Sequence, residues 1–380
     1  MQKGKNCKRC GRPIRFKDDR DYCNLCGKIV VAEEKWKVQI QQWQEEKFIE
    51  YMQYKEGERK KIEQLKQELE NMQIERETKK ENLAIDRGFL NVLAVIDAYG
   101  WAYDFIMRGI KRYSKHNLRV VPLADITKED VEWLDVLYCM HGCILNDIYN
   151  HTGCFKYVKR KCVGIFSEVY DEDIVKMGGW NVGVANQKIY DDIMQKYQHI
   201  PFKGLYVTRA GVDTEIFKPM DRPDNRFIVG WVGWADRPLK RYRLLKDLNF
   251  PFIVQTKWGW KFFVKDRSRD EMIDFYSRID CLINTSDSEA FPLPVLEAAA
   301  TGLPVVATRT SGVPEFIDSE WLVPINPEHV AMREMNSKLQ LLKDNLSLRK
   351  QVGEQNLQKV LNRWTWKYMV KEFDKMFEES

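Results

Sequence analysis

The chain has 380 residues, of which 44% are hydrophobic and 31% charged, and its formal net charge is +5. This length predicts two or three domains with large buried cores, and so small a net charge permits an anionic partner without requiring one. We expect neither a transmembrane helix nor a signal peptide, because no run approaches eighteen apolar residues and the first residues lack an apolar core. Nine cysteines then favour reduced thiols and metal ligation over disulfides, so we expect a cytoplasmic protein.

Two Cys-x2-Cys pairs stand in the first 32 residues. Cys7 and Cys10 form the first pair, Cys23 and Cys26 form the second, and twelve residues separate the two pairs. Four thiolates at this spacing are typical of a closed tetrahedral zinc site, and the glycine after each pair permits the turn. We therefore predict a zinc ribbon over residues 1–32, with a structural zinc ion; the alternative is four free thiols.

The predicted ribbon is basic. Its cations are Arg9, Arg12, Arg15, Lys17 and Lys28. A basic ribbon suits nucleic acid or another acidic surface. Few aromatic residues interleave these charges, and many zinc ribbons bind only protein, so both kinds of partner stay open.

Residues 33–86 contain no proline and a single glycine, Gly57, and are rich in Glu, Lys and Gln. Ile62, Leu65, Leu69 and Met72 follow one another at steps of three, four and three, which is the spacing of a coiled-coil seam. We predict a long helical segment here. It is either a coiled coil or helical hairpin that forms a homodimer, or a solvated linker helix.

From Phe89 onward, short apolar runs alternate with helical patterns, which is typical of βαβ units and parallel sheets. The first series of expected strands comprises 92–96, 120–123, 136–139, 162–166, 182–184 and 204–207. The second comprises 227–232, 252–255, 281–284, 305–307 and 321–324. The sequence therefore predicts an α/β protein with two doubly wound, Rossmann-like lobes, 87–221 and 222–380, and ligands bound in the cleft between them.

The stretch from Ser288 to Thr308 carries the most specific chemistry. It places Glu289 in a loop and Glu297 on the helix that follows, and this helix is expected to end at Gly302 before a buried strand. Free N–H groups at a helix start favour an anion such as a diphosphate, and a first-turn carboxylate could accept sugar hydroxyls. A second metal site from Cys139, Cys143, Cys154 and Cys162 with His141 and His151 is disfavoured, because their spacing fits no common template. Buried thiols are the better interpretation.

Several segments in order resemble the retaining GT-B glycosyltransferases of family 4. Glu289 and Glu297 match the Glu-x7-Glu signature, and Lys240, seven residues after Gly233, is similar to the lysine of the Gly-Arg…Lys-Gly segment. The other matching segments are 209–217, 276–280 and 311–315. The resemblance covers about residues 92–317. It implies transfer from a UDP- or GDP-sugar without a catalytic metal.

By this resemblance, the second lobe binds the donor. Lys240 would hold the diphosphate, with Arg237 or Arg241 as the second charge, because Trp234 stands where the family often has arginine. Glu297 would accept the ribose hydroxyls and Glu289 would lie beside the transferred sugar. Gly233 and the backbone of Ala290 and Phe291 would complete the donor site.

The first lobe would take the acceptor, which the sequence does not identify; modified DNA, protein and glycan are all candidates. Gly100 lies in the turn after the first strand, where relatives let the backbone approach the ligands. His141 would be catalytic, although a structural hydrogen-bonding histidine is the alternative. The role of a second family histidine is vacant or passes to Glu168. The competing hypothesis is a non-catalytic adaptor on a degenerate GT-B scaffold.

Overall fold

The computed structural model describes residues 56–61, 88–100, 102–142, 158–168, 173–222, 225–257 and 269–380. The predicted zinc ribbon, with Cys7, Cys10, Cys23 and Cys26, lies outside these residues. So does the predicted helical and dimerising segment of residues 33–86, apart from a helical stretch at 56–61. The two lobes described below belong to one compact unit of the chain, Glu58–Trp258 with Val264–Ser380.

The first lobe is built on a parallel sheet, whose six described strands have the order β2-β1-β3-β4-β5-β6. All six strands expected in this part of the chain are confirmed. They are β1 (Asn91–Ile96), β2 (Asn117–Pro122), β3 (Val136–Cys139), β4 (Arg160–Ile165), β5 (Asn181–Val184) and β6 (Gly204–Val207). The connecting helices are α3 (Ala102–Tyr113), α4 (Lys128–Trp133) and α6 (Gln187–Lys196), with 3-10 helices η1 (Leu123–Asp125) and η2 (Ile174–Met177).

The apolar character of the strands follows from burial on both faces of the sheet. All six residues of β1 are buried. Leu93 and Val95 pack into one apolar cluster, whereas Val92, Ala94 and Ile96 pack into another. Because successive side chains point to opposite faces, a strand covered on both sides has no polar face, which is why the sequence shows continuous apolar runs here.

The second lobe has a parallel sheet with the described strand order β11-β10-β9-β7-β8. The strands are β7 (Val229–Trp234), β8 (Phe252–Lys257), β9 (Cys281–Asn284), β10 (Val305–Thr308) and β11 (Leu322–Val323). The helices are α7 (Arg269–Ser277), α8 (Leu293–Ala300), α9 (Glu328–Asp344) and α10 (Leu346–Arg363); the 3-10 helices are η3 (Pro238–Lys240), η4 (Tyr242–Asp247), η5 (Val313–Glu315) and η6 (Ser319–Trp321). Two parallel α/β sheets are therefore confirmed. As expected, α8 ends before Gly302, whose φ is +74°.

Both sheets reverse their strand order at the first strand. β1 lies between β2 and β3, and β7 lies between β8 and β9. At such a switch point the connections leave on opposite faces, so a crevice opens at the carboxyl ends of the strands. The fold thereby selects two groups of loops as candidate binding sites, those after β1 and β3 and those after β7 and β9.

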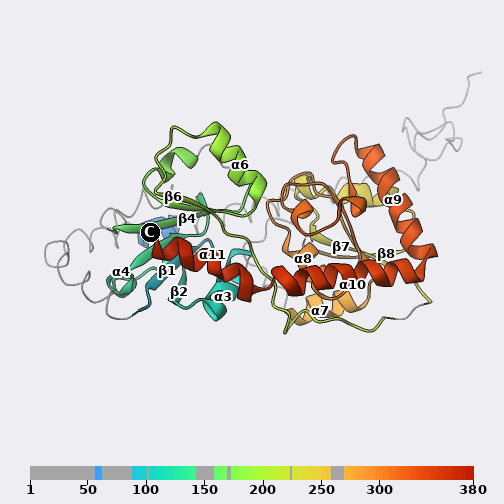
Figure 1. Cartoon of the computed structure of the whole chain (residues 1–380), viewed down its shortest axis with the longest axis horizontal. Coiled ribbons are helices and arrows are strands. Elements are labelled where there is room, and N and C mark those ends of the chain that lie inside the picture. Colours follow the sequence, from blue (N-terminus) through green and yellow to red (C-terminus); the bar gives the residue numbers. More distant parts are fainter. Residues whose placement is uncertain are drawn as a thin grey trace, which may run out of the picture. The chain divides into compact units, whose positions relative to one another are not determined.

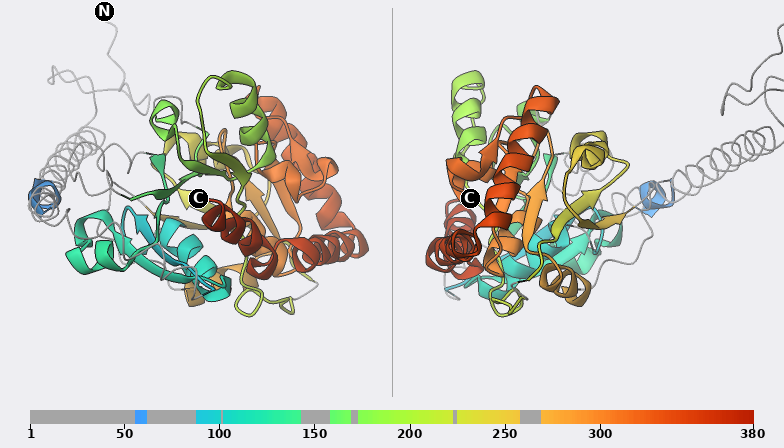
Figure 2. Two further views of the ribbon diagram at one scale, coloured as in Figure 1. Left: turned by 60° about the vertical axis from the view of Figure 1, so that its left-hand side comes forward. Right: turned by 90° about the vertical axis from the view of Figure 1, so that its right-hand side faces the viewer.

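The C-terminal helix α11 (Trp366–Glu378) departs from the predicted division of the lobes at residues 221 and 222. It follows α10 of the second lobe but lies along the first sheet (Figures 1 and 2). Phe373 and Phe377 are fully buried against Tyr138 of β3, with ring centroids 6.3 and 5.4 Å apart. Apolar burial of this helix face therefore assigns α11 to the first lobe, since the cluster that it completes is that of β1 and α3.

Within the described part of the chain, no helix is long and apolar enough to span a bilayer.

Gly109 of α3 allows the close approach of α11. A Cβ atom at this position would lie 2.1 Å from Cε2 of Trp366. We expect Gly109→Ala to lower the free energy of unfolding by about 1–3 kcal/mol, because the Trp366 ring must move. Denaturant unfolding measures the change. Lys111→Ala on the exposed side of α3 is the control, with an expected change within about 0.5 kcal/mol; equal stabilities of the two variants would contradict this packing.

Candidate functional site

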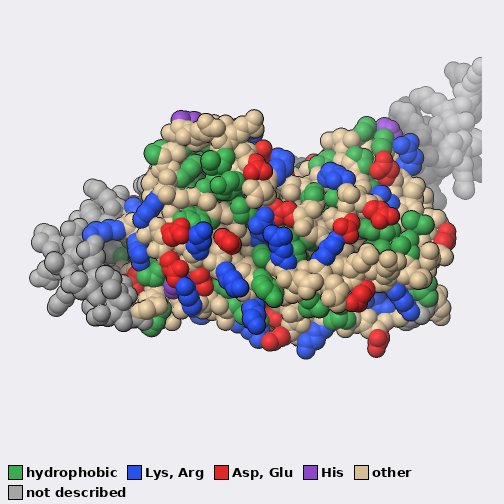
Figure 3. Space-filling model, in the orientation of Figure 1, with side chains coloured by type: hydrophobic (Ala, Val, Ile, Leu, Met, Phe, Trp, Pro, Cys, Tyr) green, Lys and Arg blue, Asp and Glu red, His purple; other side chains and the backbone are tan. Residues whose placement is uncertain are grey.

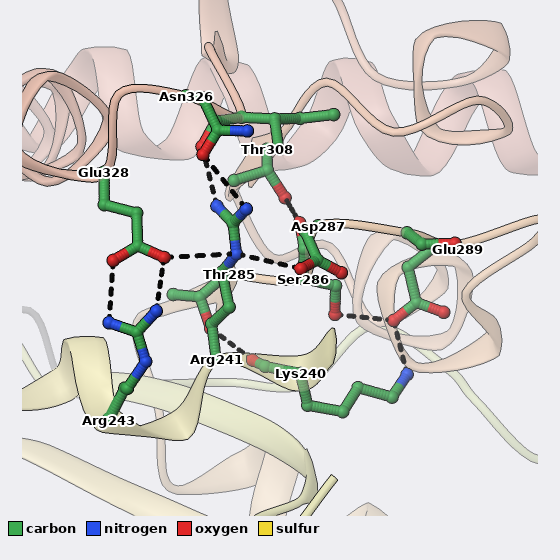
Figure 4. A network of polar contacts seen from close by, with 12 residues as sticks. Lys240, Arg241, Arg243, Thr285, Ser286, Asp287, Glu289, Thr308, Asn326 and Glu328 are labelled. Carbon is green, nitrogen blue, oxygen red and sulfur yellow. Dashed lines mark hydrogen bonds and ion pairs between the residues drawn. The ribbon is translucent and has the colours of Figure 1, made fainter. Parts of the chain in front are cut away.

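The loops after β7 and β9 bring Lys240 and Glu289 into contact. Lys240 ends η3, and its Nζ is paired with Oε1 of Glu289 (Figure 4). Ser286 Oγ donates to the same carboxylate oxygen at 2.7 Å. The side chains of Lys240 and Glu289 are only 21% and 12% exposed, so water screens this pair less than it screens a surface pair. Two of the predicted site residues are therefore neighbours at the switch point of the second sheet.

Further hydrogen bonds fix the two loops to each other. The Trp231 indole N–H donates to Thr285 Oγ1 at 2.9 Å, and Thr285 Oγ1 donates to the carbonyl of Lys240 at 2.8 Å. The Asp287 N–H donates to the carbonyl of Leu239 at 2.9 Å. Because β7 and β9 are hydrogen-bonded neighbours, their carboxyl ends deliver these loops to the same place. The position of the Lys240 backbone is thus set by main-chain and side-chain bonds, and not by its own side chain alone.

Ala290 and Phe291 continue the loop that leads to α8. Their backbone N–H groups donate to no protein acceptor within the described residues. Gly312 permits a close approach to this loop, since a Cβ there would lie 2.0 Å from the Ala290 carbonyl oxygen. The Phe291 ring packs against Trp364, with ring centroids 5.8 Å apart. These two N–H groups are therefore held beside Glu289 on a loop that is packed from the far side.

Glu297 lies in the second turn of α8, because the helix begins at Leu293. The expectation of a first-turn carboxylate is therefore wrong. The buried side chain of Tyr276 donates its hydroxyl to Glu297 Oε2 at 2.8 Å. A carboxylate has about four acceptor positions, so this bond orients Glu297 without using up its capacity to accept sugar hydroxyls.

The two candidates for a second cation differ in their surroundings. Arg241 is buried and lies 3.3 Å from Asp287 and 3.6 Å from Glu328. Arg237 is exposed, and in the described residues it makes no ion pair. Arg237 is thus the remaining candidate for a phosphate contact. Gly233 lies on β7 against the ring of Trp231. A Cβ atom at this position would lie 2.6 Å from that ring, so the close packing requires glycine.

The first sheet brings Gly100 and His141 to its own switch point, after β1 and β3. Gly100 has a φ of +79°, and its N–H donates to Asp104 Oδ2 at 2.8 Å. The His141 ring lies 5.4 Å from that of Tyr103, measured between centroids. Burial lowers the pKa of His141 below its ordinary value, and the nearby Asp173 opposes this only in part. His141 is therefore a neutral imidazole near pH 7.

Contacts between the lobes were not apparent from the sequence. Glu168, which follows β4, accepts from Ser288 Oγ and, at 3.2 Å, from the Ser311 N–H. The Asn186 side chain donates to the Ala290 carbonyl at 2.7 Å. Glu168 thus bonds to the loop that holds Glu289 and to the loop after β10, instead of standing free for an acceptor. Sequence reasoning missed Ser286 and Asn186, because a lone serine or asparagine in a loop carries no distinctive pattern.

The described residues contain no group of three or more His, Cys, Asp or Glu side chains suited to a metal ion. Cys139 and Cys162 are buried free thiols, as expected. Burial raises the pKa of the Cys162 thiol to about 12. Cys143, Cys154 and His151 lie outside the described residues.

Residues 261–359 match the family model described as glycosyl transferases group 1. An uncharacterized glycosyltransferase of Methanocaldococcus jannaschii is 24% identical over 245 residues, which are 64% of this chain and 60% of that protein. The chain spans less than two thirds of the length of the curated relatives that it matches.

Solved structures of other proteins share the fold of the two lobes. Sucrose-phosphate synthase from Thermosynechococcus elongatus superposes with a TM-score of 0.59 at 11% identity, over 76% of this chain and 98% of that one. HepE of Anabaena, solved in complex with UDP and glucose, gives 0.58 at 11% identity over 77% and 100%. The GT-B arrangement of the two α/β lobes is therefore confirmed as a fold.

Two histidines, the buried His116 and the half-buried His141, make the stability of the fold depend on pH. Burial lowers the pKa of both His116 and His141 from the ordinary 6.5. Between the lowered and the ordinary pKa, the unfolded chain binds more protons than the folded one, so stability rises with pH and is lost as pH falls below about 6.5. We expect urea unfolding to show this slope and His141→Gln to reduce it. His329→Gln, at an exposed histidine, is the control. An unchanged slope in the His141→Gln variant would contradict the burial of the His141 ring.

Proposed function

We propose that the chain is a retaining glycosyltransferase that moves a sugar from a UDP- or GDP-sugar to an acceptor. The observation that carries this proposal is the convergence of Lys240, Glu289 and the N–H groups of Ala290 and Phe291 at the carboxyl edge of the second sheet. A lysine and unpaired backbone N–H groups are the donors that a diphosphate requires. A UDP-sugar is supported by the likeness to HepE, whose solved complex holds UDP and glucose, and the GDP alternative rests on the family resemblance.

The chemistry of transfer explains why these groups lie together. As the bond between sugar and diphosphate breaks, negative charge develops on the leaving phosphate and positive charge at the anomeric carbon. Lys240 and the N–H dipoles stabilise the negative charge on the phosphate. The Glu289 carboxylate lies on the side of the positive charge at the anomeric carbon. The loop contacts fix Lys240 and Glu289 before the donor binds, so these groups need little reorganisation in the transition state. The positive charge comes from the protein itself, so no catalytic metal is needed in this proposal.

Glu297 supplies the donor's second anchor in this proposal. Its carboxylate, oriented by Tyr276, would accept hydrogen bonds from the ribose hydroxyls. Arg237 would add a cation at the diphosphate. Gly100 and His141 would line the acceptor side, where His141 would take or hold a proton of the acceptor hydroxyl. Retention of configuration and membership of family 4 rest on the resemblance of the Glu-x7-Glu segment.

The acceptor remains a choice among modified DNA, protein and glycan. On the face shown in Figure 3, Lys and Arg side chains are interspersed with Asp and Glu, so this face offers no surface of one sign to nucleic acid. The predicted basic zinc ribbon and the predicted dimer segment remain predictions about residues 1–86. The adaptor hypothesis is not favoured, because a degenerate scaffold would have no reason to keep Lys240, Glu289 and Ser286 bonded at the switch point.

Transfer itself is tested with a panel of labelled UDP- and GDP-sugars incubated with DNA, protein and lipid fractions. We expect one fraction to gain label and Glu289→Gln to lower the rate by about 10²–10³-fold, the usual loss when one stabilising group leaves a transition state. Label in no fraction, together with no hydrolysis of any donor, would reject the proposal.

The donor site is tested separately by calorimetric titration with UDP and GDP. We expect Lys240→Ala to weaken the preferred nucleotide by about 10–100-fold, as for the loss of a charged hydrogen bond. Glu297→Ala should weaken both the nucleotide and the free nucleoside, because it acts at the ribose. The exposed Lys246→Ala, on neighbouring η4, is the matched control and should bind as the unchanged protein does. If the Glu297→Ala variant bound the nucleotide with unchanged affinity, the assignment of Glu297 to the ribose would be wrong.

A further inference from the structure

Arg241 has an unusual backbone. Among the described residues other than glycine, it alone has a positive φ, at φ 51° and ψ 38°. This left-handed conformation places Cβ close to the following carbonyl, so glycine is the usual residue there. An arginine persists in such a conformation only when its surroundings hold it, and such residues cluster at functional sites.

The guanidinium of Arg241 is held on several sides (Figure 4). Nη1 donates to the Ile325 carbonyl at 2.6 Å, Nη2 donates to Asn326 Oδ1 at 3.2 Å, and Nε donates to Asp287 Oδ2 at 3.3 Å. Glu328 lies 3.6 Å from Nε. The side chain of Arg241 is only 6% exposed. This set of contacts, the Arg241 clamp, fixes the side chain and with it the backbone.

The left-handed residue separates η3 from η4. The Arg241 N–H donates to the Pro238 carbonyl and closes η3, and the Arg241 carbonyl accepts from the Leu244 N–H and opens η4. Without the reversal at Arg241, the two 3-10 helices would continue in one direction. With it, Lys240 reaches toward Glu289 on one side, while Arg243 reaches toward Glu328 on the other (Figure 4).

The clamp and the candidate donor site share a loop. Asp287, which binds Arg241, is two residues from Glu289, which binds Lys240. A change of backbone conformation at Arg241 would therefore move the Lys240 ammonium relative to Glu289 while leaving both strands in place.

We propose that Arg241 is the positioning residue for Lys240. Its guanidinium holds the left-handed turn that aims the Lys240 ammonium at the donor diphosphate, and it makes no contact with the donor itself. This inference rests on the proposed function, because the diphosphate is the ligand proposed for Lys240.

The test compares Arg241→Ala with Arg241→Gly, each alone and combined with Lys240→Ala. UDP, GDP and the free nucleosides uridine and guanosine are titrated by calorimetry, and thermal unfolding shows that each variant folds. Alanine removes the clamp and still disfavours the turn, whereas glycine removes the clamp but adopts the turn freely. We expect Arg241→Ala to weaken the diphosphate about tenfold or more, Arg241→Gly by less than about threefold, and nucleoside binding to be unchanged. With Lys240→Ala already present, Arg241→Ala should add less than about twofold, because the two residues act as a unit.

Several results would overturn the inference alone, provided that the unchanged protein binds UDP or GDP. These are equal binding by Arg241→Ala and the unchanged protein, equal losses in the alanine and glycine variants, and a full additional loss on the Lys240→Ala background. Equal losses would mean that Arg241 is only a buried partner for Asp287 and Glu328. If the unchanged protein binds neither nucleotide, the proposed function fails and this inference fails with it. Should Arg241→Ala not fold, Asp287→Ala replaces it, with a smaller loss that again disappears on the Lys240→Ala background.

Discussion

The structure of the candidate site depends on one constraint, the hydrogen-bonded adjacency of β7 and β9. Because these parallel strands pair directly, the loops that leave them must meet, and Thr285 bonds to the carbonyl of Lys240 where they do. The ion pair between Lys240 and Glu289 follows from that meeting. A cation and an anion that are far apart in sequence are thereby fixed at one edge of the sheet before any ligand binds, as a preorganised site requires.

The apolar face of α11 is a second constraint, because it joins the end of the second lobe to the first sheet. Phe373, Met376 and Phe377 are buried in the cluster of the first sheet, although the preceding helix belongs to the second. The Asn181 side chain of β5 also donates to the Met376 carbonyl at 2.9 Å. Together with the bonds from Glu168 and Asn186 to the loop around Glu289, this packing means that the first lobe contributes directly to the order of the donor loop.

Much of the fold could be predicted from the sequence, because parallel strands that are buried on both faces leave continuous apolar runs. β3 and β6 were predicted at their observed bounds, and Gly302 ended its helix as expected. The crossing of α11 could not be predicted, since an amphipathic helix shows that it has an apolar face but not which sheet covers it. The start of α8 was misplaced because Pro292 and Pro294 both suit a first turn.

At the site, the sequence identified the residue types but not their supports. Lys240, Glu289 and Glu297 stood in a recognisable spacing, whereas Ser286, Tyr276 and the Arg241 clamp depend on contacts between segments far apart in the chain. The left-handed backbone of Arg241 was invisible for the same reason: an arginine in a sequence gives no sign of a positive φ. The local sequence pattern thus indicates which residue types form the site, whereas contacts between distant segments determine how these residues are arranged.

The most direct measurement is a crystal structure of the protein with its preferred nucleoside diphosphate bound. The account predicts phosphate oxygens within hydrogen-bonding distance of Lys240 Nζ and of the N–H groups of Ala290 and Phe291, with the ribose at Glu297. A nucleotide bound elsewhere, or a Lys240 that stays paired with Glu289 and does not touch phosphate, would contradict it.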